Sequence, residues 1–398
     1  MPVADFLLMS NPKWTIYLQD HRGTGKSSPL NCKDGNPPSF APYNDTVKNM
    51  YTACSSYLSE SFKKNQTFFT ARNAAKDLRT SIDLMGLIKV GVYAWSYGTY
   101  MTNILMQLPG KIDLVVLDGP WDPQKLYMAN SNLAGLVANQ LLHLCVTNSS
   151  VCSGLLGVQA QVPSFVIHGI ADGSLPCLQK LPWLNNKQGA YYFSAWTYGM
   201  VATKANHPLL GPLLYRLYRC SPSDVEQLNV FYSWNQPGTL YRTSTSRFSL
   251  GLGVNVAASE LYSPNKSTEP DYDDQLLFYR KELINGDGQI IMAHARYETS
   301  QQLYTYIPEN KNYATPKFPV FILVGTLDPQ TVSGYGLTVK NGLGTSTSQL
   351  PSSFLLFLEL DARVKTNTSL YSFQHSTHIY SITIYSIYIL TTNIYGYY

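Results

Sequence analysis

The residues most suited to chemistry lie in the short segment 94–98, AWSYG, with Ser96 at its centre. Apolar residues before the segment favour a strand, and the residues after it favour a helix. A serine on a sharp turn from strand to helix exposes its Oγ, and the next backbone N–H can stabilise an oxyanion. Such a turn needs small neighbours, which Ala94 satisfies. The segment therefore predicts a nucleophile elbow, with Ser96 as nucleophile and the Tyr97 N–H as oxyanion donor. The alternative is a serine that only caps a helix.

The elements that must position this serine alternate between strand and helix. Strands are expected at 14–20, 89–94 and 113–118, and helices at 70–86 and 99–108. The first of these helices is predicted from apolar residues that recur every three or four positions and from Gly86 as its stop. Such alternation is typical of a parallel sheet covered by helices, so we expect the α/β class.

The middle of the chain lacks this regular alternation. Residues 120–315 mix helical stretches such as 134–144 with segments rich in Pro, Gly and Tyr, and they contain most of the cysteines. Strands are expected again at 319–325 and 353–360, so the sheet residues flank the irregular part. We therefore expect a first core part, an inserted and largely helical cap, a second core part and a tail, at residues 1–119, 120–315, 316–363 and 364–398.

Three motifs occur in a characteristic order along the chain. They are Tyr17-Leu18-Gln19-Asp20-His21-Arg22-Gly23-Thr24-Gly25-Lys26-Ser27, the elbow Ser96-Tyr97-Gly98-Thr99-Tyr100, and Gly325-Thr326-Leu327-Asp328-Pro329-Gln330-Thr331. With these motifs, residues 5–362 resemble the α/β-hydrolase serine exopeptidases related to prolyl iminopeptidase and tripeptidyl aminopeptidase. The resemblance implies an α/β-hydrolase fold, a mostly parallel sheet with flanking helices and an inserted cap, and peptide hydrolysis through an acyl-enzyme.

The resemblance also implies a role for Asp328. In the family an acid at the end of a late strand orients the catalytic histidine, and the chain order serine, aspartate, histidine is that of α/β hydrolases. Asp172 is a rival, because it follows an apolar run that looks like a strand, but it lies in the irregular cap. We therefore favour Asp328 as the triad acid over Asp172. The alternative for Asp328 is a plain turn aspartate before a proline.

Two parts of the family pattern are missing from their usual places. The histidine is expected just after residues 358–362, where the chain continues with Arg-Val-Lys-Thr. The nearest later candidates for the catalytic histidine are His375 and His378. A His-Gly-Gly-Pro type loop, which would supply the second oxyanion donor, is expected before the first strand, yet residues 1–13 contain no glycine. On these grounds we expect a chain truncated at both ends, with an incomplete core and feeble activity of its own.

The composition changes sharply after Arg363. Residues 364–398 contain one charged residue, no proline and a dense mixture of Ile, Tyr, Thr and Ser. We hypothesise that this low-complexity tail is translated intron or frameshifted sequence. The alternative is a genuine β-rich tail that packs on the domain and supplies His375 or His378. The segment 379–390 is uncharged and rich in β-branched and aromatic residues, a type that aggregates unless it is covered.

The cysteines and glycosylation sequons point to a compartment. Six cysteines form an even set, in which Cys145 and Cys152 bracket a short polar loop that a disulfide could close. The full connectivity is left open. Sequons for N-linked glycans stand at Asn44, Asn65, Asn148, Asn265 and Asn367. Together these features predict a secreted glycoprotein, or one of a lysosome-like or vacuole-like compartment, with disulfides. Free thiols and chance sequons are the alternative.

Composition also limits the partners. Charged residues make up 14% of the 398 residues and the net charge is +4 without a long basic run, so we expect no nucleic acid. No apolar stretch reaches the roughly 20 residues that a membrane-spanning helix needs, so we expect no membrane. A phosphate-binding loop ending at Gly25-Lys26-Ser27 would need a glycine where the chain has Asp20. We expect a peptide substrate, no cofactor and no metal, and leave the oligomeric state open.

By the resemblance, the sequence predicts a serine hydrolase, specifically an exopeptidase that releases N-terminal residues from peptides. Two alternatives are open. One is a catalytically impaired or inactive protein of the same fold, or a gene fragment, that keeps the cap as a binding surface; the displaced histidine favours it. The other is an esterase or lipase, because the cap carries no readable specificity motif.

Overall fold

A six-stranded sheet organises the computed structural model. The structure describes residues 14–28, 30, 32–33, 45–61, 65–124, 127–157, 161–185, 193, 197–198, 200–201, 206–234, 252, 256, 260–261, 308–329, 331–345, 355–360 and 388–392. The strands are β1 (Trp14–Leu18), β2 (Gly91–Trp95), β3 (Leu114–Asp118), β4 (Val320–Gly325), β5 (Leu355–Leu360) and β6 (Tyr388–Thr392), and their order in the sheet is β1-β6-β2-β3-β4-β5.

The sheet is parallel from β2 to β5, and its apolar residues explain why. Strands β2, β3, β4 and β5 pair with one another in parallel. Val92, Val115 and Ile322 are almost completely buried, because helices cover a parallel sheet and its strands read as continuous apolar runs. These strands and the helices predicted around Ser96 are observed with ends shifted by no more than two residues. The predicted helical stretch 134–144 is part of a longer helix.

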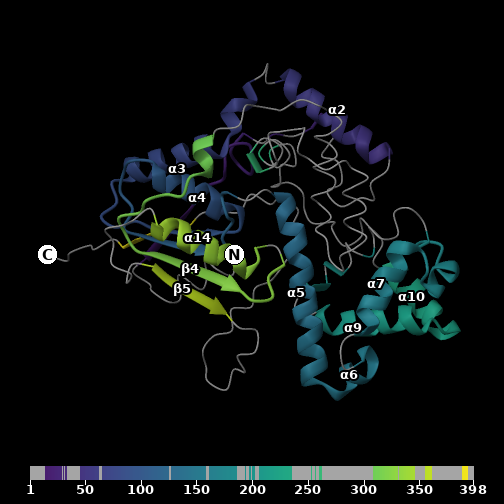
Figure 1. The fold of residues 1–398 in the computed structure, drawn as a ribbon. Helices are drawn as coiled ribbons and strands as arrows, with labels where there is room; N and C mark the ends of the chain where they lie inside the picture. Colours follow the sequence, from purple (N-terminus) through teal and green to yellow (C-terminus); the bar gives the residue numbers. More distant parts are fainter. Residues whose placement is uncertain are drawn as a thin grey trace.

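Helices of both core parts flank the sheet. They are α2 (Asp45–Ser61), the short η1 (Asn65–Phe69), α3 (Ala71–Met85) and α4 (Tyr97–Gln107), and α14 (Ser333–Thr345) follows β4. Figure 1 shows α3, α4 and α14 on the same side of β4 and β5. The side chain of Thr70 accepts the N–H of Asn73 at the start of α3, and Gly86 ends the helix at φ 58°. The predicted stop at Gly86 is confirmed.

The described residues that follow β3, as far as Trp234, are largely helical. The helices are α5 (Tyr127–Asn148), α6 (Ser150–Leu156), α7 (Gln161–Asp172), the short η2 (Pro176–Lys180), α9 (His207–Arg219) and α10 (Pro222–Trp234). Figure 1 shows them beside the sheet, and they enclose a hydrophobic cluster of their own. The strand-like appearance of the run before Asp172 was misleading, since it forms α7. Its apolar residues, Val166 among them, face other cap helices. The domain boundaries themselves stay a prediction.

Part of the tail belongs to the sheet. Residues 388–392 form β6, which pairs antiparallel with both β1 and β2. This placement agrees with the alternative of a β-rich tail that packs on the domain, and the origin of the tail sequence stays a hypothesis. The rest of the tail, including His375 and His378, lies outside the described residues.

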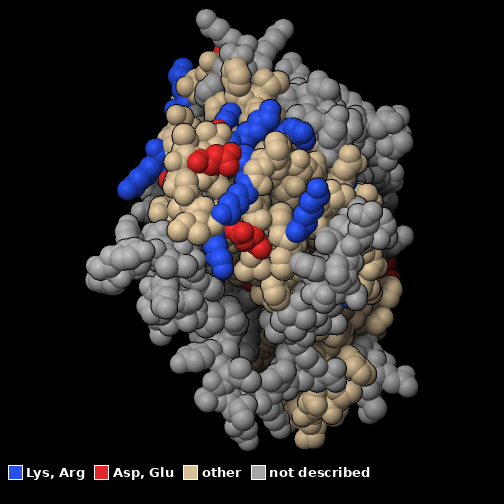
Figure 2. Space-filling view, turned by 90° about the vertical axis from the view of Figure 1, so that its left-hand side faces the viewer, with Lys and Arg blue, Asp and Glu red and all other residues tan. Residues whose placement is uncertain are grey.

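The surface carries its charges in small groups. On the face shown in Figure 2, Lys and Arg side chains are spread among uncharged residues, with Asp and Glu between some of them. Ion pairs of the described residues include Arg22 with Asp77 and Arg79 with Asp83. None of the helices in the described part of the chain combines the length and the apolar character needed to cross a lipid bilayer.

Three disulfides join the six cysteines. The bonded pairs are Cys32–Cys54, Cys145–Cys152 and Cys177–Cys220. The predicted Cys145–Cys152 bond is therefore confirmed, and it ties the last turns of α5 to α6 across a Cα separation of 5.7 Å. The other two bonds fasten the loop after β1 to α2, and η2 to the end of α9.

Replacing Cys145 and Cys152 together with serine is expected to lower the free energy of unfolding. The closed loop is short, and the chain-entropy model gives a loss of about 2 to 3 kcal/mol. Urea denaturation of the wild type and the variant measures this loss, with Ser153→Ala, a half-buried residue on the helix of Cys152, as control. Equal unfolding midpoints for the serine variant and the wild type would contradict the expectation.

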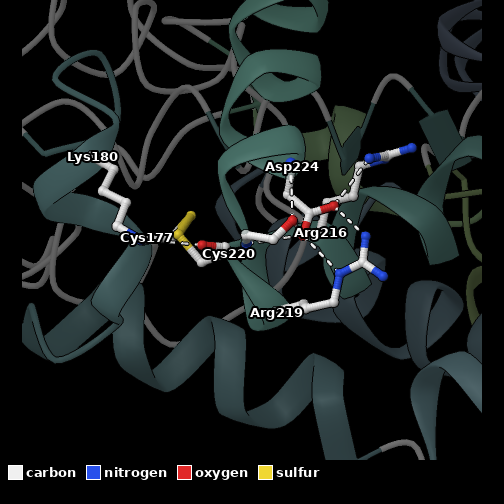
Figure 3. Close-up of a disulfide and its surroundings, with 7 residues drawn as sticks. Cys177, Lys180, Arg216, Arg219, Cys220 and Asp224 are labelled. Atoms are coloured by element: carbon white, nitrogen blue, oxygen red, sulfur yellow. Dashed lines mark hydrogen bonds and ion pairs between the residues drawn. A yellow bond between two sulfur atoms is a disulfide. The ribbon is translucent and has the colours of Figure 1, made fainter.

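A buried carboxylate fastens α9 to α10 next to the third disulfide. Figure 3 shows Asp224 between Arg216 and Arg219, with Cys177–Cys220 and Lys180 alongside. The Asp224 side chain is fully buried and accepts hydrogen bonds from Arg219 Nε at 2.8 Å and Arg216 at 3.0 Å. Ser221 N also donates to Asp224 at 3.0 Å, and Asp224 N donates back to the Ser221 hydroxyl. This reciprocal pair is a capping box at the start of α10.

Asp224→Asn is expected to destabilise the protein in a pH-dependent way. The hydrogen bonds from Arg219 hold the pKa of the Asp224 carboxyl well below its usual range. A depressed folded-state pKa stabilises the fold fully above the ordinary value of about 3.9; below that value the contribution declines, and it is lost only as pH falls through the folded-state pKa. We expect the variant to lose about 2 kcal/mol at pH 7, the net value of charged hydrogen bonds, and to lose less at pH 3. Denaturant titrations at both pH values measure this; the exposed Glu226→Gln should show no such pattern.

Candidate active site

Ser96 adopts a backbone conformation that few residues tolerate. It lies between β2 and α4 at φ 53° and ψ −125°, and only Cys220 shares a positive φ among the described residues other than glycine. Such conformations cost about 1 to 3 kcal/mol and gather at functional sites. The Ser96 side chain makes no hydrogen bond to the helix N-terminus. The capping alternative is therefore not what the structure shows, and the Oγ is left for other chemistry.

The first turn of α4 surrounds the serine with backbone groups. Tyr97 is the first residue of the helix, and Thr99 donates both its N–H (2.9 Å) and its hydroxyl (2.5 Å) to the Ser96 carbonyl. The first N–H groups of a helix have no acceptor inside the helix, and the helix dipole favours negative charge there. Ala94 is completely buried, as expected for a position where the backbone crowds. The local geometry is that of a strand–turn–helix elbow with an anion-binding end.

Asp328 lies in the turn that follows β4. Its Oδ1 accepts the backbone N–H of Thr331 at 3.1 Å, and its Oδ2 accepts the Thr331 hydroxyl at 2.7 Å. Asp328 N also donates to the Gly325 carbonyl at 3.3 Å. Both carboxylate oxygens are thus oriented by one residue three positions later. Sequence reasoning missed Thr331, although an aspartate followed three residues later by threonine, just before a helix, is a recognisable side-chain-to-backbone pattern.

The end of β3 connects the serine turn with the aspartate turn. Ser96 N donates to the Asp118 carbonyl at 3.0 Å, and the next residue, Gly119, donates to Leu323 of β4 at 2.9 Å. Gly119 has φ 57°, and a Cβ there would lie 2.5 Å from Thr331 Oγ1 and 3.5 Å from Asp328 Oδ2. Strands β2 and β4 flank β3, so their ends are about 10 Å apart.

The loop after β1 touches the elbow from the other side. The rings of His21 and Tyr97 have centroids 6.2 Å apart, and His21 is buried. Burial lowers the pKa of His21 to about 4, so its imidazole is neutral at neutral pH. Arg22 fixes the loop through Asp77 on α3 and through the Phe68 carbonyl at 2.6 Å. The first and second sequence motifs therefore meet in space.

The same loop uses its backbone amides internally. Lys26 N donates to the Asp20 carboxylate at 2.8 Å, and Ser27 N donates to the Thr24 carbonyl at 3.0 Å. Among the residues that the structure describes, the next helix is α2, which begins at Asp45. A phosphate-binding loop instead points its amides outward and continues into a helix. The geometry of this loop therefore agrees with the sequence argument against a phosphate-binding loop.

A buried polar network that was not predicted from the sequence connects the elbow helix α4 with its neighbours. Glu260 is completely buried and accepts hydrogen bonds from Tyr100 OH at 2.9 Å, Ala71 N at 2.8 Å and Asn310 Nδ2 at 3.1 Å. These bonds join α3, α4 and the segment before β4. Lys311 lies near the Tyr100 ring, and its burial lowers its pKa to about 8. A lone glutamate in an irregular region offers no local pattern from which these contacts could be inferred.

The remaining predicted residues fall into two groups. Asp172 is at the end of α7, exposed, and bonded to Ser174 N at 2.9 Å rather than to any residue near Ser96. The candidate histidines His375 and His378 lie outside the described residues. The structure thus brings Ser96, Tyr97 and Asp328 to the carboxyl ends of the parallel strands β2 and β4.

The fold and the positions of these residues at the strand ends together define a class of protein. A mostly parallel sheet with flanking helices, a serine elbow after one strand and an acidic turn two strands away make up the α/β-hydrolase fold. Residues 4–141, about a third of the chain, match the family model described as alpha/beta hydrolase fold. No curated protein matches the chain. The fold and the match support a hydrolase in general.

Proposed function

We propose that the protein is a serine hydrolase that forms an acyl-enzyme on Ser96, and that its substrates are peptides from which it releases N-terminal residues. One observation carries the hydrolase part of this proposal: Ser96 is held at a strained positive φ while its Oγ makes no capping bond. A purely structural serine would have no reason to keep that strain. The motif order along the chain supports the peptidase part.

The proposed chemistry assigns each group a role. The Ser96 Oγ attacks the scissile carbonyl carbon and passes its proton to a histidine, while the Tyr97 N–H stabilises the oxyanion. The histidine then gives the proton to the leaving amine as the C–N bond breaks, and water hydrolyses the resulting ester. Asp328 orients the histidine, for which His375 and His378 are the candidates. The two hydrogen bonds that Thr331 donates keep the Asp328 carboxylate oriented for this role.

The proposal extends to the compartment. Three disulfides favour an oxidising environment, such as the secretory route or a lysosome-like compartment. The sequon at Asn148 stands on an exposed side chain at the end of α5, where a glycan can be attached without disturbing the core. Mass spectrometry of secreted material, before and after removal of N-glycans, tests this part independently of activity.

The function is tested with a fluorophosphonate probe and three substrates. We expect covalent labelling at Ser96, and cleavage of an alanyl tripeptide nitroanilide with a free amino terminus at least about 10-fold faster than its N-acetylated form, a difference of about 1.4 kcal/mol. A nitrophenyl ester serves as the third substrate. Absence of labelling would favour the non-catalytic alternative, and hydrolysis of the ester alone would favour an esterase.

A further inference from the structure

The first turn of α4 carries a hydroxyl that bonds to two segments at once. Thr99 is buried, and its Oγ1 donates to the Ser96 carbonyl at 2.5 Å. The same Oγ1 accepts the backbone N–H of Trp121 at 2.8 Å. A hydroxyl has one hydrogen to donate and lone pairs with which to accept, so the two bonds are compatible. One side chain therefore links the serine turn to the segment that follows β3.

Two segments join the predicted cap, residues 120–315, to the core. The chain leaves β3 through residues 119–124, the outgoing segment, and reaches β4 through residues 308–319, the returning segment. The fully buried Asp122 connects them, because its Oδ1 accepts the N–H of Gln124 at 2.9 Å and the hydroxyl of Tyr313 at 2.7 Å. The outgoing and returning segments are thus bonded to each other.

The helix α4 also binds the returning segment. Asn103 Nδ2 and Gln107 Nε2 donate to the Asn312 carbonyl at 2.8 and 2.9 Å. Asn103 Oδ1 accepts the N–H of Ala314 at 3.0 Å. Thr99, Asn103 and Gln107 are four residues apart, so they lie along one face of the helix. One row of polar side chains, on the helix that follows the serine turn, therefore contacts both segments.

The backbone of Ser96 depends on bonds of this kind. A residue other than glycine keeps a positive φ only when its surroundings stabilise it. Ser96 N donates to the Asp118 carbonyl at 3.0 Å, and the Ser96 carbonyl accepts both the N–H and the hydroxyl of Thr99. The hydroxyl bond depends on the outgoing segment, because the N–H of Trp121 fixes the orientation of the Thr99 side chain.

We propose that Thr99 is a positioning residue for the nucleophile, and that it couples the packing of the outgoing and returning segments on α4 to the conformation of the Ser96 turn. The inference rests on the proposed function, since it concerns the rate at which Ser96 is acylated. While both segments contact α4, the Thr99 hydroxyl stabilises the positive φ of Ser96. When they move away, this bond loses its support and the Ser96 Oγ leaves the position from which it attacks. Displacement of the cap therefore slows acylation.

The first test compares Thr99→Val with Thr99→Ser. Valine has nearly the shape of threonine but no hydroxyl, whereas serine keeps the hydroxyl. We expect Thr99→Val to lower kcat and the rate constant of fluorophosphonate labelling by roughly 10- to 100-fold with little change in KM, because small misplacements of reacting groups have effects of that size. Thr99→Ser should recover most of the loss. All rates are measured per folded molecule, below the melting temperature of each variant.

Thr102→Val is the matched control for this test. Thr102 is also buried on α4, but its Oγ1 has no hydrogen-bond partner among the described residues. Its replacement should leave kcat and the labelling rate unchanged. A Thr99→Val protein that is labelled as fast as the wild type, or a Thr102→Val protein that is slowed equally, would overturn the proposal.

The second test acts on the connection between the segments and leaves Thr99 in place. Tyr313→Phe removes the hydroxyl that donates to Asp122. We expect slower labelling and faster hydrogen exchange at the N–H groups of Ser96 and Thr99. In the double variant with Thr99→Val, the second substitution should add little to the first, because the coupling is already lost. Additive effects on the labelling rate would contradict the coupling.

The two proposals fail in different ways. A wild-type protein that is not labelled at Ser96 contradicts the proposed function. Hydrogen exchange at the Ser96 and Thr99 N–H groups requires no activity, so it still decides whether the serine turn depends on the outgoing and returning segments. Faster exchange in Tyr313→Phe, with Thr102→Val unchanged, supports the coupling, and unchanged exchange in Tyr313→Phe overturns it.

Discussion

Ser96→Ala is expected to abolish labelling by a fluorophosphonate probe and to reduce hydrolysis by roughly a million-fold, the usual consequence of removing the nucleophile of an acyl-enzyme mechanism. The substitution removes one oxygen atom from a half-buried side chain that caps no helix, so the fold should be unaffected. Activity and labelling are measured on the same preparation with matched circular dichroism spectra.

The control for this experiment is Ser81→Ala on α3. Ser81 donates its hydroxyl to the Asp77 carbonyl one turn earlier and has no role in the proposed chemistry. Its alanine variant should keep full labelling. Labelling that persists in Ser96→Ala, or disappears in Ser81→Ala, would remove Ser96 from the nucleophile role.

A companion variant, Ser96→Gly, distinguishes the effect of backbone strain on stability from the effect of the serine hydroxyl on activity. Glycine adopts a positive φ at no steric cost, so replacing Ser96 should remove local strain while it also removes the nucleophile. The net gain should be about 1 kcal/mol, since the strain of 1 to 3 kcal/mol is offset in part by the greater entropy of glycine in the unfolded chain. Thermal melting should show a more stable but inactive protein. A less stable glycine variant would mean that the turn is not strained.

The sequence predicted the local parts of the fold well because each carries its own pattern. Helix α3 has apolar residues at helical spacing, a threonine cap and a glycine stop, and it was found within one residue of its expected ends. The parallel strands could be read from short apolar runs such as residues 320–325, since a strand with one buried and one half-buried face needs no polar alternation. The elbow at Ser96 was expected for the same reason: its signal lies within a few consecutive residues.

The features that the sequence did not predict depend on contacts between distant residues. A β-rich tail was considered, but its place in the sheet was not predicted. The five residues of β6 contain no pattern that identifies β1 and β2 as the strands with which they pair. Glu260 likewise lies in an irregular region and gains its role only through Tyr100 and Ala71. Asp172 shows the converse error. An apolar run before an acidic residue fits a strand and a buried helix equally well, and helix α7 is the outcome.

Asp328→Asn is expected to have the second largest effect, a loss of roughly 10,000-fold in turnover, as is typical when the orienting acid of such a triad becomes an amide. An asparagine keeps the size of the side chain and can still accept the Thr331 N–H at Oδ1. Its NH₂ group, which takes the place of Oδ2, accepts neither the Thr331 hydroxyl nor a histidine N–H, and so it favours the wrong histidine tautomer. Turnover should fall while the probe still reacts slowly with Ser96.

Two further variants make the role of Asp328 testable against simpler explanations. Asp172→Asn removes the rival carboxylate, and because that side chain is exposed and bonded only locally, activity should remain at the wild-type level. Thr331→Val removes the hydroxyl bond to Asp328 Oδ2 but keeps the backbone bond, so the carboxylate is oriented less firmly. We expect a loss in turnover between those of the other two variants, with little change in substrate binding. A purely structural Asp328 predicts a different outcome, in which Asp328→Asn and Thr331→Val lower the melting temperature together and activity falls only as far as the folded fraction does.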